Sequence, residues 1–126
     1  MRKNLPSFQL LGKQGEDFAA SYLIHKGYTI LKRNFRVRYG EIDIIATQHN
    51  TLVFVEVKTR SNDYFGQPEE AISQKKIREI IKTSQIYKES IHNVPDLERI
   101  DVIAIIMNHN GKMTQINHIE NVTGFL

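Results

Sequence analysis

The chain has 126 residues, which suffices for one domain with a buried core, and we expect residues 1–126 to form a single domain. It contains no cysteine, which excludes a disulfide framework, a thiolate nucleophile and any zinc site with cysteine ligands. Neither a membrane span nor a secretory signal is recognisable, so we expect a cytoplasmic protein with no membrane partner. The net charge of +3 favours a polyanionic partner without requiring one.

The first predicted element is an amphipathic helix near residues 8 to 26. Small and apolar residues recur there at helical spacing, namely Leu11, Gly15, Phe18, Ala19 and Tyr22, and Gly27 is placed to end the helix. At 100° per residue, Glu16 borders the apolar stripe, whereas Asp17 projects to roughly the opposite side. We therefore expect Glu16 near the rest of the domain and Asp17 in solvent.

Three strands are predicted next, at residues 28–36, 40–47 and 51–58, each rich in β-branched or aromatic residues. Pro68-Glu69-Glu70 is typical of a helix start, and the apolar face of this second helix would consist of Ile77, Ile80, Ile81, Ser84 and Tyr87. Two more strands are predicted, at 100–107 and 113–119. The order indicates an α/β domain with a mixed five-stranded sheet flanked by helices.

Acidic residues interrupt two apolar strands where burial is expected. Side chains alternate along a strand, so Glu56 and Lys58 share one face of the third strand, and Glu41, Asp43 and Ile45 share one face of the second. A two-residue turn at 49–50 would place Ile45 opposite Phe54 and Asp43 opposite Glu56. Two facing carboxylates about 5 Å apart at Cβ repel unless one is protonated or a cation lies between them.

A divalent metal would resolve this repulsion. Oxygen ligands of this kind suit Mg²⁺ or Mn²⁺, so we expect Asp43 and Glu56 to be the metal ligands. Lys58 would lie beside the metal and stabilise charge on a phosphate, and Glu16 could complete the site. Two alternatives remain: an acid and a lysine two residues apart often form an exposed ion pair, and the acids could instead bind Arg33, Arg36 or Arg38.

Basic residues gather just before the second strand, with no acid among them: Lys26, Lys32, Arg33, Arg36 and Arg38. They could protect an edge strand from aggregation or could contact phosphates. In the second case the candidate nucleic-acid contacts are Arg33, Arg36, Arg38, Arg60, Lys75 and Lys76. No glycine-rich phosphate loop or HExxH motif is present, the histidines are expected in turns or at the surface, and Asp101 is expected to pair with Arg99 or a nearby backbone group.

Several motifs together resemble a known family: Gly15-Glu16, Gly-Glu-Ile-Asp-Ile-Ile-Ala at 40–46, Phe-Val-Glu-Val-Lys-Thr-Arg at 54–60, Phe65-Gly66, Arg99-x-Asp101 and His118-Ile119-Glu120-Asn121. The chain resembles the YraN family of uncharacterised bacterial proteins. That family is similar to archaeal Holliday junction resolvases and to PD-(D/E)xK nucleases of restriction-endonuclease-like fold. The resemblance implies that Asp43, Glu56 and Lys58 are the motif residues and that Glu16 stands in the place of the resolvases' helical acid.

These observations lead to two functional hypotheses. The first is a metal-dependent endonuclease that cuts phosphodiester bonds in structured or branched DNA by in-line attack of a metal-activated water. The second is a catalytically inactive adaptor that binds nucleic acid in DNA repair or recombination. A homodimer would suit action on both strands of a duplex, although no segment of the sequence marks an interface.

Overall fold

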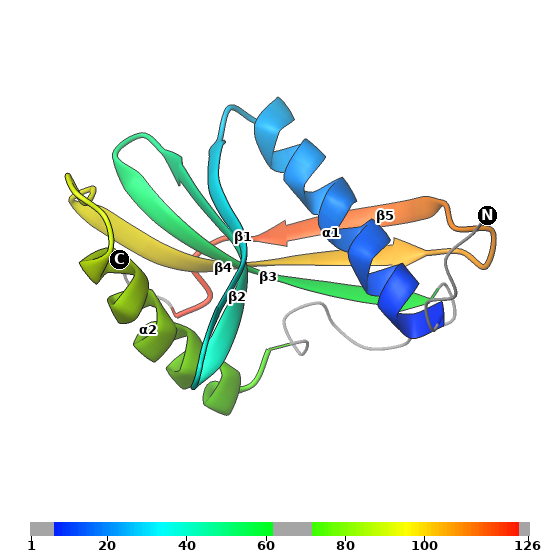
Figure 1. Cartoon of the computed structure of the whole chain (residues 1–126). Coiled ribbons are helices and arrows are strands. Elements are labelled where there is room, and N and C mark those ends of the chain that lie inside the picture. The colour runs from blue at the N-terminus through cyan, green and yellow to red at the C-terminus, as the bar shows by residue number, and fades with distance from the viewer. Residues whose placement is uncertain (1–6, 62–71, 124–126) are drawn as a thin grey trace, which may run out of the picture.

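The computed structural model describes residues 7–61 and 72–123 of the chain (Figure 1). In chain order its elements are α1 (Ser7–His25), β1 (Thr29–Val37), β2 (Gly40–Gln48), β3 (Thr51–Ser61), α2 (Gln74–Glu89), β4 (Leu97–Met107) and β5 (Met113–Ile119). The prediction of an α/β domain with a mixed five-stranded sheet is confirmed, and the arrangement is consistent with a nuclease-like fold.

The five strands lie in the sheet in the order of the sequence, β1-β2-β3-β4-β5. Neighbouring strands are antiparallel except β3 and β4, which run parallel from the pair Thr51 and Leu97 to the pair Ser61 and Met107. A parallel pair needs a crossover connection, and α2 lies within the one between β3 and β4. The mixed character of the sheet therefore follows from the position of α2 in the chain.

Residues with positive φ form the tight turns of the fold. His49 and Asn50 have φ values of 51° and 57°, as a two-residue turn of type I′ requires. This turn sets the predicted register, and Ile45 lies opposite Phe54. Gly27, with a φ of 93°, follows the end of α1, where Tyr28 N–H donates to the Leu23 carbonyl.

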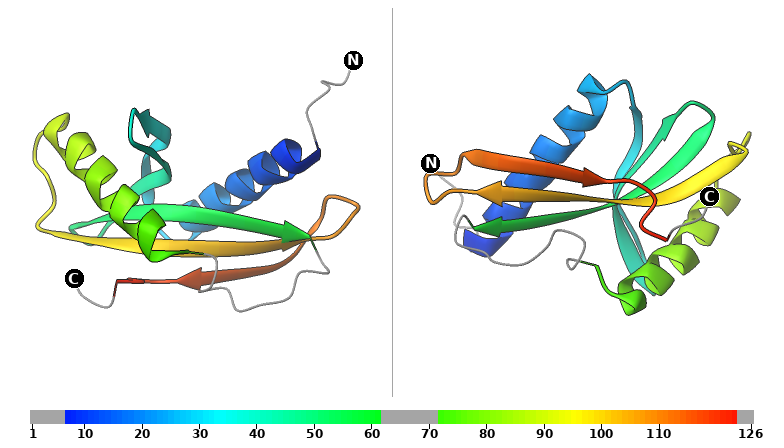
Figure 2. Two further views of the ribbon diagram at one scale, coloured as in Figure 1. Left: turned by 90° about the horizontal axis from the view of Figure 1, so that it is seen from below. Right: turned by 180° about the vertical axis from the view of Figure 1, so that it is seen from behind.

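Two apolar cores lie on the two faces of the sheet, one under each helix. Val53 and Val55 of β3 pack in the core with α1, whereas Leu52 and Phe54 pack in the core with α2. Figures 1 and 2 show α1 and α2 on opposite sides of the β1–β2 hairpin. β3 is thus a central strand covered on both faces, as the apolar sequence of its first half predicts.

The start of α2 differs from the prediction. The helix begins at Gln74 with Ser73 as its N-cap, whose hydroxyl accepts from Lys76 N–H, and Pro68-Glu69-Glu70 lies outside the described residues. The buried face also differs, since Ile81 is 41 % exposed and Thr83 is buried instead. Thr83 fits this apolar face because its hydroxyl donates to the Glu79 carbonyl.

No helix in the described part of the chain combines the length and apolarity needed to cross a membrane.

Candidate metal and phosphate site

The site lies where β2 separates from β3. Their paired residues run from Gln48 and Thr51 to Ile44 and Val55, so the ladder stops one pair before Asp43 and Glu56. Beyond that point the Asp43 carboxylate accepts a hydrogen bond of 2.8 Å from Val57 N–H. Asp43 and Glu56 therefore do not form the expected pair of the β2–β3 ladder. Instead, the Val57 backbone holds the Asp43 side chain in place.

The predicted alternation along β2 fails around Asp43. Ile42 and Ile45 both pack in the core under α2, whereas Ile44 packs in the core under α1. Strict alternation would put Ile42 on the side of Ile44, so the expected common face of Glu41, Asp43 and Ile45 does not persist. The physical reason is that β2 stays paired with β1 as far as Gly40 while it leaves β3, and the hairpin turns away from the rest of the sheet (Figure 1).

Glu56 is a buried carboxylate whose charge is only partly compensated by its neighbours. Its side chain is 6 % exposed, and its neighbours are Lys58, with Nζ 3.6 Å from Oε2, and Lys76, with Nζ 3.9 Å from Oε1. No hydrogen bond from the described residues reaches Oε1. Burial, and then the charge of Asp43, raise the pKa of Glu56 to about 7 against the opposing effect of the two lysines. The metal-free site therefore disfavours the ionised carboxylate.

The two carboxylates suit a hard divalent cation. Burial also raises the pKa of Asp43, although the bond from Val57 N–H opposes this effect. A cation bound between Asp43 and Glu56 would supply the charge that the buried Oε1 lacks. Across the described residues, no three His, Asp or Glu side chains gather closely enough to hold a metal, so protein ligands would be few. Mg²⁺ accepts one or two carboxylates and keeps several waters, and the residues present fit it.

Gly15 places Glu16 near this site. A Cβ at Gly15 would lie 1.9 Å from Thr59 Oγ1, so only glycine lets α1 contact β3 so closely. Burial, and then the charge of Asp43, raise the pKa of Glu16, which shows that the two acids interact. The Glu16 carboxylate lies 3.6 Å from Arg33 Nη2. Glu16 is thus within electrostatic reach of Asp43 but forms no three-acid metal group with other residues that the structure describes.

The basic residues predicted to contact phosphate differ in their surroundings. Asp17 is exposed, as predicted, but it is also ion-paired: Arg33 Nη2 bonds it at 2.8 Å because α1 lies against β1. Arg36 Nε lies 3.2 Å from Glu41, its partner across the β1–β2 ladder. The alternative in which arginines bind the acids of the hairpin is therefore realised for Glu41, and Arg33 lies near Glu16 of α1 as well.

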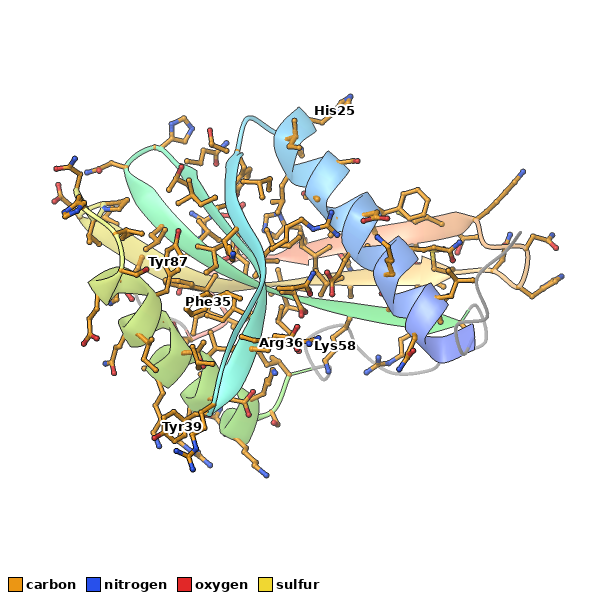
Figure 3. The ribbon with its side chains drawn as sticks, viewed as in Figure 1. His25, Phe35, Arg36, Tyr39, Lys58 and Tyr87 are labelled. Carbon is orange, nitrogen blue, oxygen red and sulfur yellow. The ribbon has the colours of Figure 1, made fainter. Side chains whose placement is uncertain are left out.

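The other four predicted contacts differ in exposure and in their partners. Arg38 and Lys75 are exposed, and Arg60 is half-buried with Nη1 donating to the Thr59 carbonyl. Lys58, 30 % exposed, extends from β3 (Figure 3), and Lys76 of α2 contacts Glu56 itself. Figure 3 also shows Tyr39 at the tip of the β1–β2 hairpin, near Arg38 in sequence.

A second polar cluster surrounds Asp101, which is fully buried on β4. Its carboxylate accepts from Arg99 Nε at 3.0 Å and from Asn121 N–H at 2.9 Å, and lies 2.7 Å from His118 Nε2. The pairing with Arg99 and a backbone group is as predicted, but the His118 side chain is only 7 % exposed rather than at the surface. Its other ring nitrogen lies 3.1 Å from the Tyr22 hydroxyl, so the cluster joins α1, β4 and β5.

This second cluster is saturated with hydrogen bonds. Asp101 has a donor on each oxygen, and Arg99 also donates to the Tyr28 hydroxyl at 2.7 Å. Burial raises the pKa of Asp101, but the hydrogen bonds from His118 and Arg99 outweigh it and hold the pKa below its usual range. The cluster therefore stabilises the fold. The sequence signal for it was an acid and a histidine within two apolar strands, which only the β4–β5 register brings together.

Comparison with known proteins agrees with the motifs. The model of the uncharacterised protein family UPF0102, the YraN family, matches residues 15–105, which include all four candidate catalytic residues. A UPF0102 protein of Persephonella marina is 47 % identical over 110 residues, covering 87 % of this chain and 90 % of that protein. Another, of Syntrophomonas wolfei, is 45 % identical over 111 residues, covering 88 % and 95 %. The chain belongs to the uncharacterised protein family UPF0102.

Proposed function

We propose that this protein is a metal-dependent endonuclease that hydrolyses phosphodiester bonds in DNA. One observation carries the proposal: Glu56 is buried beside Asp43 with one carboxylate oxygen unbonded, and Lys58 lies on the same strand at the rim. Buried carboxylates that repel each other are costly to keep in a fold. A cation that binds both carboxylates would offset this cost, which explains why two acids lie here beside a lysine.

Asp43 and Glu56 would hold Mg²⁺ or Mn²⁺. The bond from Val57 N–H fixes one Asp43 oxygen, and Glu56 presents Oε1, to which no described residue donates a hydrogen bond. When bound, the ion supplies an activated water and neutralises charge on the scissile phosphate. Because β2 separates from β3 at this point, Asp43 can bond Val57 N–H and is held beside Glu56 before the ion binds.

Lys58 and Glu16 have different roles in this proposal. Lys58 keeps its ammonium 3.6 Å from Glu56 and is partly exposed, so it can reach a phosphate at the rim and stabilise developing negative charge. Burial, and then the charge of Asp43, raise the pKa of Glu16, and a higher pKa makes its carboxylate a stronger base. It would assist by orienting or deprotonating water rather than by ligating the ion.

The substrate we propose is structured or branched DNA, on the resemblance to Holliday junction resolvases. Arg38, Arg60 and Lys75 would contact phosphates, and Arg33 and Arg36 would do so by exchanging their acidic partners for phosphates, whereas Arg38 and Lys75 are exposed. A homodimer would address both strands of a duplex, and such a protein would act in the cytoplasm.

The test is incubation of the purified protein with Mg²⁺ or Mn²⁺ and a panel of linear, flap and four-way-junction DNAs. An Asp43→Asn variant, which can still accept the Val57 bond through its amide oxygen, is the matched control. Metal-dependent cleavage by the wild type alone would support the proposal. Binding to the panel without cleavage under either metal would favour the adaptor hypothesis instead.

A further inference from the structure

Lys76 has an unusual position between two acids. It lies in the first turn of α2, where its backbone N–H donates to the Ser73 hydroxyl. Its ammonium bonds Glu79 at 2.9 Å and lies 3.9 Å from Glu56 Oε1, beyond hydrogen-bond distance. The side chain is 27 % exposed. Lys76 is therefore close enough to neutralise Glu56 without occupying its free oxygen.

The partner Glu79 is held in place by a close contact between α2 and the start of β2. A Cβ at Gly40 would lie 2.5 Å from Glu79 Cγ and 2.7 Å from Thr83 Oγ1, so glycine is required for this approach. Thr83 in turn donates to the Glu79 carbonyl at 2.8 Å. Glu79 is thus a second acceptor for Lys76, and its side chain lies against the start of β2.

A metal ion bound at Glu56 would repel the Lys76 ammonium, because both carry positive charge. A divalent ion bound to Glu56 Oε1 would place like charge within a few ångströms of the Lys76 ammonium, which would repel it. Glu79 and the solvent would then accept the ammonium, because Glu79 already bonds it at the shorter distance. A short movement of the Lys76 side chain therefore suffices to pass from the metal-free to the metal-bound site.

We propose that Lys76 is a displaceable counter-ion of this site, which neutralises Glu56 in the metal-free protein and is released by metal toward Glu79 and a substrate phosphate. The inference rests on the proposed metal site and adds to it a competition between lysine and metal. Lys76 is a positioning residue on this account: it sets the metal affinity and couples metal binding to phosphate contact.

Two variants should move the metal affinity in opposite directions. Lys76→Met keeps the aliphatic chain and removes the competing charge, so the dissociation constant for Mn²⁺ should fall roughly tenfold. Glu79→Gln removes the second acceptor's charge, so Lys76 should remain with Glu56 and the dissociation constant should rise. Lys75→Met is the matched control, because Lys75 is the exposed neighbour of Lys76, and its dissociation constant should change less than about threefold.

The measurement is calorimetric titration of Mn²⁺ into each purified protein, with thermal unfolding as the check on folding. Unchanged or weaker binding by Lys76→Met, or equal tightening by Lys76→Met and Lys75→Met, would overturn the inference while leaving the proposed function intact. Absence of Mn²⁺ binding by the wild type and every variant would overturn both.

Release of Lys76 is tested separately through DNA affinity. With Ca²⁺ bound, Lys76→Met should make the negative slope of log affinity against log salt less steep by about one for a four-way junction. With EDTA the same substitution should leave the slope unchanged, since Lys76 would be held by Glu56. An equal change of slope in both conditions would show that metal does not release the lysine and would contradict the proposal.

Discussion

Replacing Glu56 with glutamine should make the metal-free protein more stable. The side chain is 6 % exposed, and its pKa is raised from 4.5 to about 7 by burial and then by Asp43. The folded state therefore keeps a proton between these two pH values that the unfolded state has lost. Linkage requires the free energy of unfolding to fall as the pH rises through this window.

The magnitude follows from the size of the shift. At about 1.4 kcal/mol per pKa unit, the change from 4.5 to about 7 costs the wild type up to about 3 kcal/mol above pH 7. Glutamine is neutral at every pH and similar in size, so Glu56→Gln avoids this cost. For a domain of this length the midpoint of thermal unfolding should rise by roughly 10 °C at pH 8.

The assay is urea and thermal unfolding of both proteins in EDTA at pH 5 and pH 8. The two should be nearly equal at pH 5, where Glu56 is protonated, and should diverge at pH 8. Adding Mg²⁺ should stabilise the wild type at pH 8 and leave Glu56→Gln unchanged. A variant less stable than the wild type at pH 8 in EDTA would refute the reasoning, because it would mean that ionised Glu56 is fully compensated by its lysines.

Three further substitutions test other parts of the structure. Gly15→Ala should destabilise the protein by about 1 to 3 kcal/mol in urea unfolding because its Cβ would meet Thr59, although alanine favours helices; failure of Thr59→Ala to recover part of the loss would contradict the contact. Asp101→Asn should cost about 3 to 5 kcal/mol at pH 7, since a buried ion pair loses one partner, and a loss below 1 kcal/mol would count against that network. Although burial raises the pKa of Asp101, its hydrogen bonds hold it below 3.8, so this contribution should be complete at neutral pH and be lost as the pH falls below that value. Lys58→Met should slow cleavage by about 100-fold or more with the affinity for Mg²⁺ little changed; equal losses in both would assign Lys58 to metal binding instead.

Local sequence predicted most of the elements because their signals are local. The end of α1 follows from Gly27, and the β2–β3 register follows from a turn whose two residues adopt positive φ. The local signal Pro68-Glu69-Glu70 also predicted the start of α2, but the helix begins later, at Gln74. A serine three residues before Lys76 caps the helix instead, and a cap is easily missed when a stronger acidic signal precedes it.

The candidate site was predicted in its members but only partly in its geometry. Asp43, Glu56 and Lys58 stood out because charge in apolar strands is costly, and that reasoning needs no knowledge of the fold. The break of alternation at Asp43 depends on β2 following β1 away from β3, which no window of sequence records. The role of Lys76 at Glu56 depends equally on how α2 packs on the start of β2.

Ion pairs between distant segments were the least predictable feature. Asp17 is exposed, as helical geometry predicts, but its ion pair with Arg33 of β1 was not predicted. His118 was assigned to the surface because it has no metal-ligand spacing, yet it lies beside Asp101 across the β4–β5 pair. Both contacts were missed for one reason: a partner sixteen or more residues away leaves no periodic signal.

The central claim is that the buried carboxylate pair exists to bind a catalytic metal rather than to stabilise the fold. The most direct measurement is cleavage of a four-way-junction DNA with Mg²⁺ by the wild type and by Glu56→Gln at equal concentration. The account predicts that the wild type cuts and that the glutamine variant, the more stable of the two without metal, does not cut. Cleavage by Glu56→Gln at the wild-type rate would contradict it.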